Sequence, residues 1–239
     1  MIRRLHRSPL AALALCILLP LAASLSYAAA PLAGYNFNDK DTLAPTWTGA
    51  GLTASPVTWG DFGGTPQGNG SYFWSAAGGH PFPKGKGSGN LAVRVATVTK
   101  PVTRILHGTE DDAVKNNTFA SLTLTPDAGN KLNLANLTAF VAGLGADKSI
   151  GPFAATFLVR TSLDNYQTTV GTPLRLEIPK GDSLTGTLDI DLSAPAFQAI
   201  DKPVTLRVYF LANMTGGARS SAAQILRLDQ LVVNGTVTR

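Results

Sequence analysis

Residues 204–210 read Val-Thr-Leu-Arg-Val-Tyr-Phe, so apolar side chains alternate with Thr205, Arg207 and Tyr209. Successive side chains of a strand point to opposite faces, and this period of two predicts a strand with one apolar and one solvated face. The same period recurs at residues 91–96, 153–160 and 184–192. In 153–160 it directs Phe157 inward. These stretches predict sheet rather than helix.

Further candidate strands lie between clusters of Gly, Pro, Asn and Asp, at residues 34–37, 52–58, 118–125, 132–141, 169–178 and 225–237. Roughly ten strands without helical crossovers predict antiparallel pairing. Two sheets pressed face to face bury that many one-sided strands economically. We therefore expect an all-β fold, an antiparallel two-sheet β-sandwich of jelly-roll type. No linker-like change of composition divides residues 29–239, which predicts a single domain.

Turn chemistry separates the strands. Residues 126–129, residues 179–182 and the pair Asn234-Gly235 all carry residue types suited to tight or positive-φ turns. Two long segments, 60–90 and 99–117, show no sustained strand pattern. The first of them contains an aromatic cluster. Long loops are where function tends to lie. In the second segment, Glu110-Asp111-Asp112 is expected to be a solvated charge cluster.

The first 28 residues have the pattern of a secretory signal peptide. Arg3, Arg4 and Arg7 precede an uncharged apolar run, and small residues favour cleavage after Ala28. The run is about 16 residues long, short of the roughly 20 that cross a bilayer, and no later stretch approaches that length. We expect an extracellular or periplasmic protein without a membrane span after signal removal. Its only cysteine, Cys16, would be lost with the signal, so no disulfide would stabilise it.

The charge balance of the mature chain predicts no polyanion partner. Three of the twenty Lys and Arg residues lie in the signal, which leaves seventeen against fifteen Asp and Glu, although the whole chain has a pI of about 9.5. A net charge this close to zero predicts no nucleic-acid partner.

Several segments resemble secreted bacterial sandwich domains of the kind found in PEP-CTERM-type exported proteins. The segments are residues 132–152 and 157–166, together with 206–210 and 226–235, which are similar to the last two strands of that family. The resemblance covers about residues 34–237 and implies a lectin-like or laminin-G-like sandwich without an agreed activity. Such proteins often end in a sorting motif and an apolar tail, whereas this chain ends at Thr238-Arg239, so the resemblance leaves surface anchoring open.

Catalytic motifs are incomplete. Residues 181–184, Gly-Asp-Ser-Leu, match an esterase signature, but a nucleophilic serine needs a base and no histidine follows His107. The glycine-rich residues 84–89 lack the spacing and the Ser or Thr of a phosphate loop. His80 and His107 belong to no metal-binding repeat. These motifs are better explained as turns and loops.

Glycoside hydrolysis needs two carboxyl groups on either side of the scissile bond. Glu110 and Glu177 are the only glutamates, and no strand carries three carboxylates on one face. Asp189 and Asp191 share a face two residues apart, which the polar side of an amphipathic strand explains. A hydrolase using Glu110 or Glu177 with a loop aspartate is therefore the second hypothesis.

Aromatic residues give the better indication of a ligand. Tyr72 and Trp74 would point the same way on an extended segment, and Trp47 and Trp59 are near in sequence. Flat exposed rings commonly stack on sugar faces, although Trp and Tyr are also frequent in partly buried positions. We predict Trp59, Tyr72 and Trp74 as ligand-binding residues.

Sandwiches of this type often hold a structural Ca²⁺ where an N-terminal loop meets the last strand. Asp39 or Asp41 could meet Asp229 there, and Ca²⁺ takes six to eight oxygen ligands. The alternative is that Asp39 and Asp41 are solvated turn residues while Asp229 caps a β-bulge or pairs with Arg227. Both interpretations place the first and last strands side by side, which protects the sheet edges.

Export, a sandwich fold, loop aromatics and missing catalytic pairs together predict a non-catalytic extracellular module that contacts polysaccharide or cell-envelope material. A polysaccharide hydrolase and a purely structural matrix protein are the alternatives.

Overall fold

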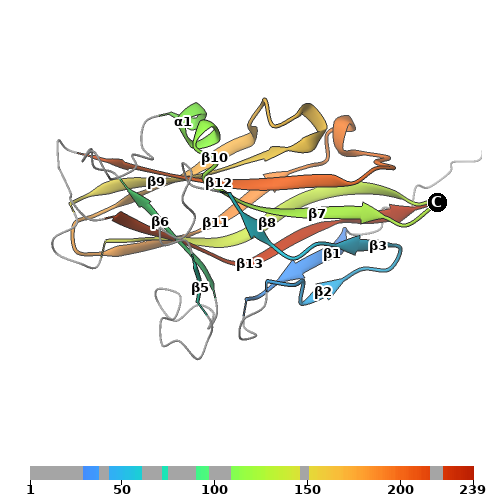
Figure 1. Cartoon of the computed structure of the whole chain (residues 1–239), viewed down its shortest axis with the longest axis horizontal. Coiled ribbons are helices and arrows are strands. Elements are labelled where there is room, and N and C mark those ends of the chain that lie inside the picture. The colour runs from blue at the N-terminus through green and yellow to red at the C-terminus, as the bar shows by residue number, and fades with distance from the viewer. Residues whose placement is uncertain are drawn as a thin grey trace, which may run out of the picture.

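A computed structural model describes residues 29–37, 43–60, 72–74, 90–96, 109–145, 151–215 and 223–239; at 72–74, 94–96 and 223 it describes the backbone alone. The predicted signal peptide, Asp39, Asp41, His80 and His107 lie outside these residues. Within them, strands form two antiparallel sheets that pack face to face (Figure 1). The predicted all-β, antiparallel two-sheet sandwich is confirmed, while the jelly-roll type stays a prediction.

Sheet A has seven strands, in the order β11-β8-β13-β1-β2, with β6 on β13 and β5 on β6. Their bounds are β1 Ala30–Tyr35, β2 Trp47–Thr48, β5 Tyr72–Trp74, β6 Asn90–Ala96, β8 Lys131–Leu144, β11 Ser183–Asp191 and β13 Ala223–Thr238. The first and last strands are side by side, as predicted, since Ala30 pairs with Gly235 and Tyr35 with Leu231. The last strand is central in the sheet, so its backbone is covered on both sides.

Sheet B has six strands, in the order β10-β9-β12-β7-β3, with β4 on β7. Their bounds are β3 Leu52–Ala54, β4 Thr58–Trp59, β7 Phe119–Pro126, β9 Phe153–Thr161, β10 Val170–Ile178 and β12 Val204–Met214. The expected single strand over 52–58 is thus two short strands. Two 3₁₀ turns, η4 (Ser162–Asp164) and η5 (Pro195–Phe197), lie between strands.

One apolar core fills the space between the sheets. Phe157 of β9 is fully buried, as the alternation predicted, and its ring meets that of Phe210 edge to face at 5.7 Å. Leu188 and Ile190 of β11 and Leu226 and Leu228 of β13 pack into the same core from sheet A. Burial of these side chains is the main stabilising term of the fold.

The outer face of sheet B corrects two expectations. Residues 110–112 are not a loop but the first turn of helix α1 (Glu110–Lys115), capped by Thr109 in a capping box with Asp112. The helix covers a second apolar cluster that includes Phe119, Leu158 and Tyr209. Strand β9 is therefore buried along both faces rather than solvated on one. Alternation alone could not show that another element covers its second face.

Asn234-Gly235 is also not a turn. The pair lies inside β13, where the register against β8 shifts. A Cβ on Gly235 would lie 2.2 Å from the Asn133 carbonyl oxygen, so only glycine lets β8 approach this closely. The turn predictions at Gly129 and Gly181 are confirmed by their φ angles of 81° and 76°. In the part of the chain that the structure describes, no helix has the length and apolar character needed to cross a bilayer.

Candidate functional site

Trp47 lies on the outer face of sheet A. Trp47 is the backbone partner of Gly34 on β1, so the two residues share one face of the sheet. On that face a Cβ added to Gly34 would lie 3.9 Å from the Val232 side chain of β13. The exposed fraction of Trp47 is 47%, and among the described residues only Leu163, at 41%, is another exposed large apolar side chain. Exposure of an indole costs hydrophobic free energy, which makes this ring the most conspicuous apolar feature of the face.

An open cleft of about 730 Å³ lies beside Trp47. Pro31 of β1 and Thr236 and Thr238 of β13 line it, together with the backbone around Gly49. A Cβ on Gly49 would lie 3.4 Å from the indole, so the ring extends over this glycine. The cleft is thus lined by an indole and two threonines, and Ala30, Leu32 and Val237 add apolar surface.

A row of polar residues crosses the same face. Asp191, Asn136, Asn234 and Pro31 are successive backbone partners on β11, β8, β13 and β1. The Asn136 side-chain amide donates to Asp189 at 2.9 Å, and the Asn234 amide donates to Asn136 at 2.8 Å. These bonds hold two amides and a carboxylate in a fixed line across three strands.

A second hollow, of about 440 Å³, opens over this row. Ala29, Ala135, Asn136, Asp189 and Asp191 line it. Because Ala29 directly precedes the β1 residues that line the Trp47 cleft, the two hollows lie on either side of the start of β1. We call the two hollows together the sheet A face.

Asp191 on the sheet A face is not suited to the role of general acid. Hydrogen bonds from the Ser193 hydroxyl and amide lower the pKa of Asp191, whereas a general acid needs a raised pKa. Glu110 instead accepts a hydrogen bond from Thr169 at 2.6 Å, and Glu177 is ion-paired with Arg175 at 2.7 Å on the edge strand β10. The glutamates of the hydrolase hypothesis are thus occupied by local partners.

The predicted ligand residues are distributed differently. Trp59 is half-buried, pairs with Ala120 across β4 and β7, and packs against the main core. Tyr72 and Trp74 lie on β5, where their backbones pair with Ala92 and Asn90. The side chains of β5 lie outside the described residues, so their role stays a prediction. The packing of Trp59 favours a structural role for that residue.

Asp229 is fully buried on β13, facing away from the core. Its carboxylate accepts the Gln230 amide at 2.7 Å where β13 bulges, with Gln230 at a φ of 47°. Among the described residues its second oxygen has no hydrogen-bond partner, and burial raises the pKa of Asp229 to about 7. The bulge contact agrees with the alternative given above, while the metal prediction with Asp39 and Asp41 stays open.

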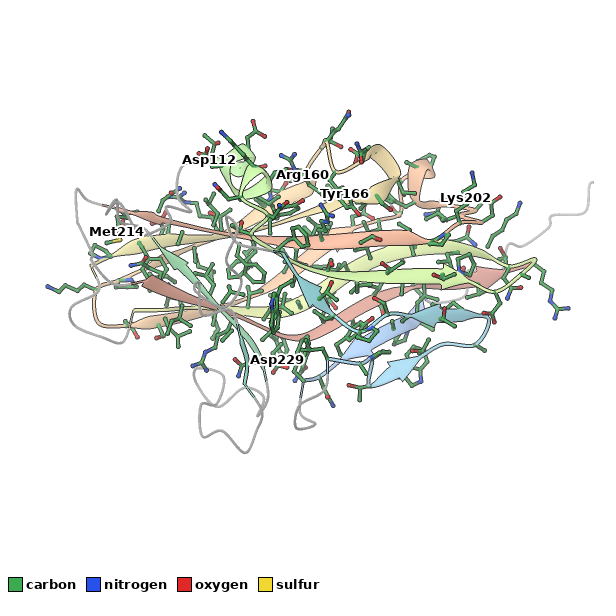
Figure 2. The ribbon with its side chains drawn as sticks, in the orientation of Figure 1. Asp112, Arg160, Tyr166, Lys202, Met214 and Asp229 are labelled. Atoms are coloured by element: carbon green, nitrogen blue, oxygen red, sulfur yellow. The ribbon has the colours of Figure 1, made fainter. Side chains whose placement is uncertain are left out.

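No cluster of three or more metal-ligating side chains occurs among the described residues. Figure 2 shows Asp229 on the side of the molecule opposite Arg160 and Tyr166, which lie near α1. Trp47 is close to the aromatic cluster in sequence but was not among the predicted ligand-binding residues. Its position between Pro45 and the glycines at 49 and 51 was the available signal, since such segments run along the surface.

No family model matches the sequence, and no curated protein matches it. Among solved structures, the K1 adhesin domain of Lys-gingipain from Porphyromonas gingivalis W83 is 14% identical, with 84% of this chain and 95% of that chain covered and a TM-score of 0.35. The N-terminal cellulose-binding domain of Cellulomonas fimi β-1,4-glucanase C is 17% identical, with 88% and 99% covered and a TM-score of 0.35.

A Stig cyclase from Fischerella sp. TAU is 15% identical, with 91% of this chain and 93% of that chain covered and a TM-score of 0.31. Adhesin domains, carbohydrate-binding modules and an enzyme thus all appear among these structures. Identities and TM-scores this low transfer no function to this chain.

Proposed function

We propose that this chain is an exported, non-catalytic module that contacts polysaccharide through the sheet A face. The observation that carries the proposal is the exposed indole of Trp47 beside an open cleft. Axial C–H groups of a sugar ring pack on such a flat apolar surface, while its hydroxyls need polar partners at the edge.

The polar row supplies those partners. Sugar hydroxyls both donate and accept, and the row offers amides, which do both, and carboxylates, which accept. The mutual hydrogen bonds of Asp189, Asn136 and Asn234 fix these groups before a ligand arrives, which lowers the entropy cost of binding. Cell-envelope glycan and free polysaccharide share this chemistry. Export through residues 1–28 and kinship with PEP-CTERM-type proteins remain part of the proposal.

The test is binding to a panel of soluble neutral polysaccharides, namely mixed-linkage glucan, xylan, galactan and mannan, measured by affinity electrophoresis and calorimetry. Trp47→Ala should weaken binding about tenfold or more, because central aromatic residues dominate binding energies. Asn136→Ala should give a smaller loss. Trp59→Phe, which keeps an aromatic ring on the core, is the control and should bind as the wild type does.

Two results would contradict the proposal. One is an equal affinity of Trp47→Ala and the wild type for every polysaccharide that binds. The other is the absence of any binding across the panel, which would favour the structural matrix alternative. Release of reducing ends by the wild-type protein would instead support the hydrolase alternative.

A further inference from the structure

Two arginines lie side by side on the outer face of sheet B. Arg160 of β9 and Arg207 of β12 are direct backbone partners, and both side chains point away from the core. Like charges in directly opposed positions of neighbouring strands repel. The pair therefore needs compensation by anions or by acceptors.

Arg160 has such compensation within the chain. Its guanidinium donates to the carbonyls of Tyr166 and Gln167 at 3.1 and 3.0 Å, and it lies 3.3 Å from the Asp111 carboxylate of α1. Only 7% of the residue is exposed. It ties the loop after η4 and the helix to the sheet, which is a structural role.

Arg207 has no comparable partners. Its guanidinium carbon lies 4.1 Å from the centre of the Phe119 ring and 3.6 Å from that of Tyr166, so aromatic rings hold it in place. Its one hydrogen bond, to the Tyr209 hydroxyl, is long at 3.4 Å. A guanidinium has five N–H donors. Among the described residues no carboxylate pairs with Arg207, and the side chain is half-buried rather than freely solvated.

The ring over Arg207 is held at a backbone cost. Tyr166 has a φ of 60° and follows Asn165 at 58°, a conformation that is rare for an aromatic residue. Its amide donates to the Thr161 carbonyl at 2.8 Å, and its own carbonyl accepts from Arg160. Strained residues persist where surrounding contacts over-determine them and are frequent at ligand sites.

Hydroxyl groups continue the row from Arg207. Ser121 of β7 is its backbone partner, and Thr58 of β4 is the partner of Ser121. The Ser121 and Thr58 hydroxyls lie 2.9 Å apart, and Thr58 is exposed. In such a pair one hydroxyl donates to the other, and the second hydroxyl can still donate its own hydrogen bond to an external acceptor.

We propose that Arg207, with Ser121 and Thr58, binds an oxyanion group, a carboxylate or a sulfate, carried by an acidic polysaccharide. A guanidinium fixed in one plane favours planar, charge-assisted hydrogen bonds to such groups. The site is distinct from the sheet A face, since it lies on the other sheet. One chain thus has a face for neutral sugar surfaces and a separate site for acidic groups.

The test is binding of polygalacturonate, which carries carboxylates, and dextran sulfate, which carries sulfates, with unmodified dextran as the uncharged blank. Arg207→Gln should weaken binding of at least one polyanion about tenfold or more, since a charge-assisted bond is lost. Arg175→Gln removes the same charge from an exposed position on β10 and should change binding less than about twofold.

Arg207→Lys keeps the charge but not the planar fork, and it should lose several-fold in affinity. This variant keeps the test valid if Arg207→Gln fails to fold. Loss with one polyanion alone identifies the oxyanion as carboxylate or sulfate. Three results would each overturn the proposal. They are equal losses of affinity in Arg175→Gln and Arg207→Gln, full binding by Arg207→Lys, and no polyanion binding by the wild type.

Discussion

The two outer faces of the sandwich are built from the same strand pattern but bring different groups together. The sheet A face presents Trp47 with amides and the carboxylates of Asp189 and Asp191. The outer face of sheet B presents Arg160 and Arg207 among aromatic rings and hydroxyls. A net charge close to zero does not reveal where these groups lie, so whole-chain composition is a poor guide to either face.

Both faces rest on one core, and the largest effect is expected there. Phe157→Ala should lower the free energy of unfolding by about 3–5 kcal/mol, because a fully buried ring is removed and a cavity is left. Leu163→Ala, a truncation at an exposed position, should cost less than about 0.5 kcal/mol. Urea unfolding measures both. A loss below about 1 kcal/mol for Phe157→Ala would mean that the Phe157 ring is not packed in the core between the two sheets.

Within sheet A, the pKa values of Asp229 and Asp191 are shifted in opposite directions. Burial raises the pKa of Asp229 to about 7, whereas hydrogen bonds from Ser193 lower the pKa of exposed Asp191. The pKa of Asp229 is thus higher in the folded state than in the unfolded state, where it is near 4. The stabilisation from this shift is fully present below about pH 4 and is lost as the pH rises towards 7. Wild-type stability should fall by about 1 kcal/mol per pH unit over this range.

Asp229→Asn cannot titrate and should remove this slope, measured by unfolding in EDTA from pH 4 to 8. Asp191→Asn is the matched control and should keep the slope, because a lowered pKa acts only at more acidic pH. Identical pH profiles for Asp229→Asn and the wild type would show that Asp229 is ionised in the folded state throughout this range.

The calcium proposal uses the same variant. If Asp39 or Asp41 joins Asp229 around Ca²⁺, millimolar Ca²⁺ at pH 8 should raise the melting temperature of the wild type but not of Asp229→Asn. EDTA should reverse the effect. Melting temperatures that do not respond to Ca²⁺ or EDTA would end the proposal.

The smallest effect is expected at the ion pair on the sheet B side. The Asp111 side chain is 90% exposed, so Asp111→Asn should lower the free energy of unfolding by less than about 1 kcal/mol. The carbonyls of Tyr166 and Gln167 would still hold Arg160. Thermal melts at low and high salt provide the measurement. A larger, salt-sensitive loss would show that Asp111 neutralises both arginines.

Much of the fold could be predicted because local chemistry specifies it. The period-two alternation in β9, β11 and β12 identified the strands and the inward side of Phe157. Turn-favouring residue types at 126–129 and 179–182 identified two turns, which the positive φ angles of Gly129 and Gly181 confirm. Asn234-Gly235 misled because the same residue pair suits a turn and a bulge, and pairing with β8 decides between them.

The sites could be predicted far less well. Asp189 and Asp191 were assigned to the polar side of a strand, which is correct, but their line with Asn136 and Asn234 joins three strands distant in sequence. Arg207 was noted only as part of an alternating pattern. Its pairing with Arg160, and the fact that no described carboxylate pairs with it, follow from strand order, which no local pattern contains.

The sequence by itself determined the strands, the inward-facing residues and the all-β class, because side-chain periodicity and turn preferences act over a few residues. Only the tertiary structure decided which outward-facing residues became neighbours, and which of them α1 buried. Register and sheet order are set by the summed packing of both sheets, and a chemical site on an outer face is a consequence of that order.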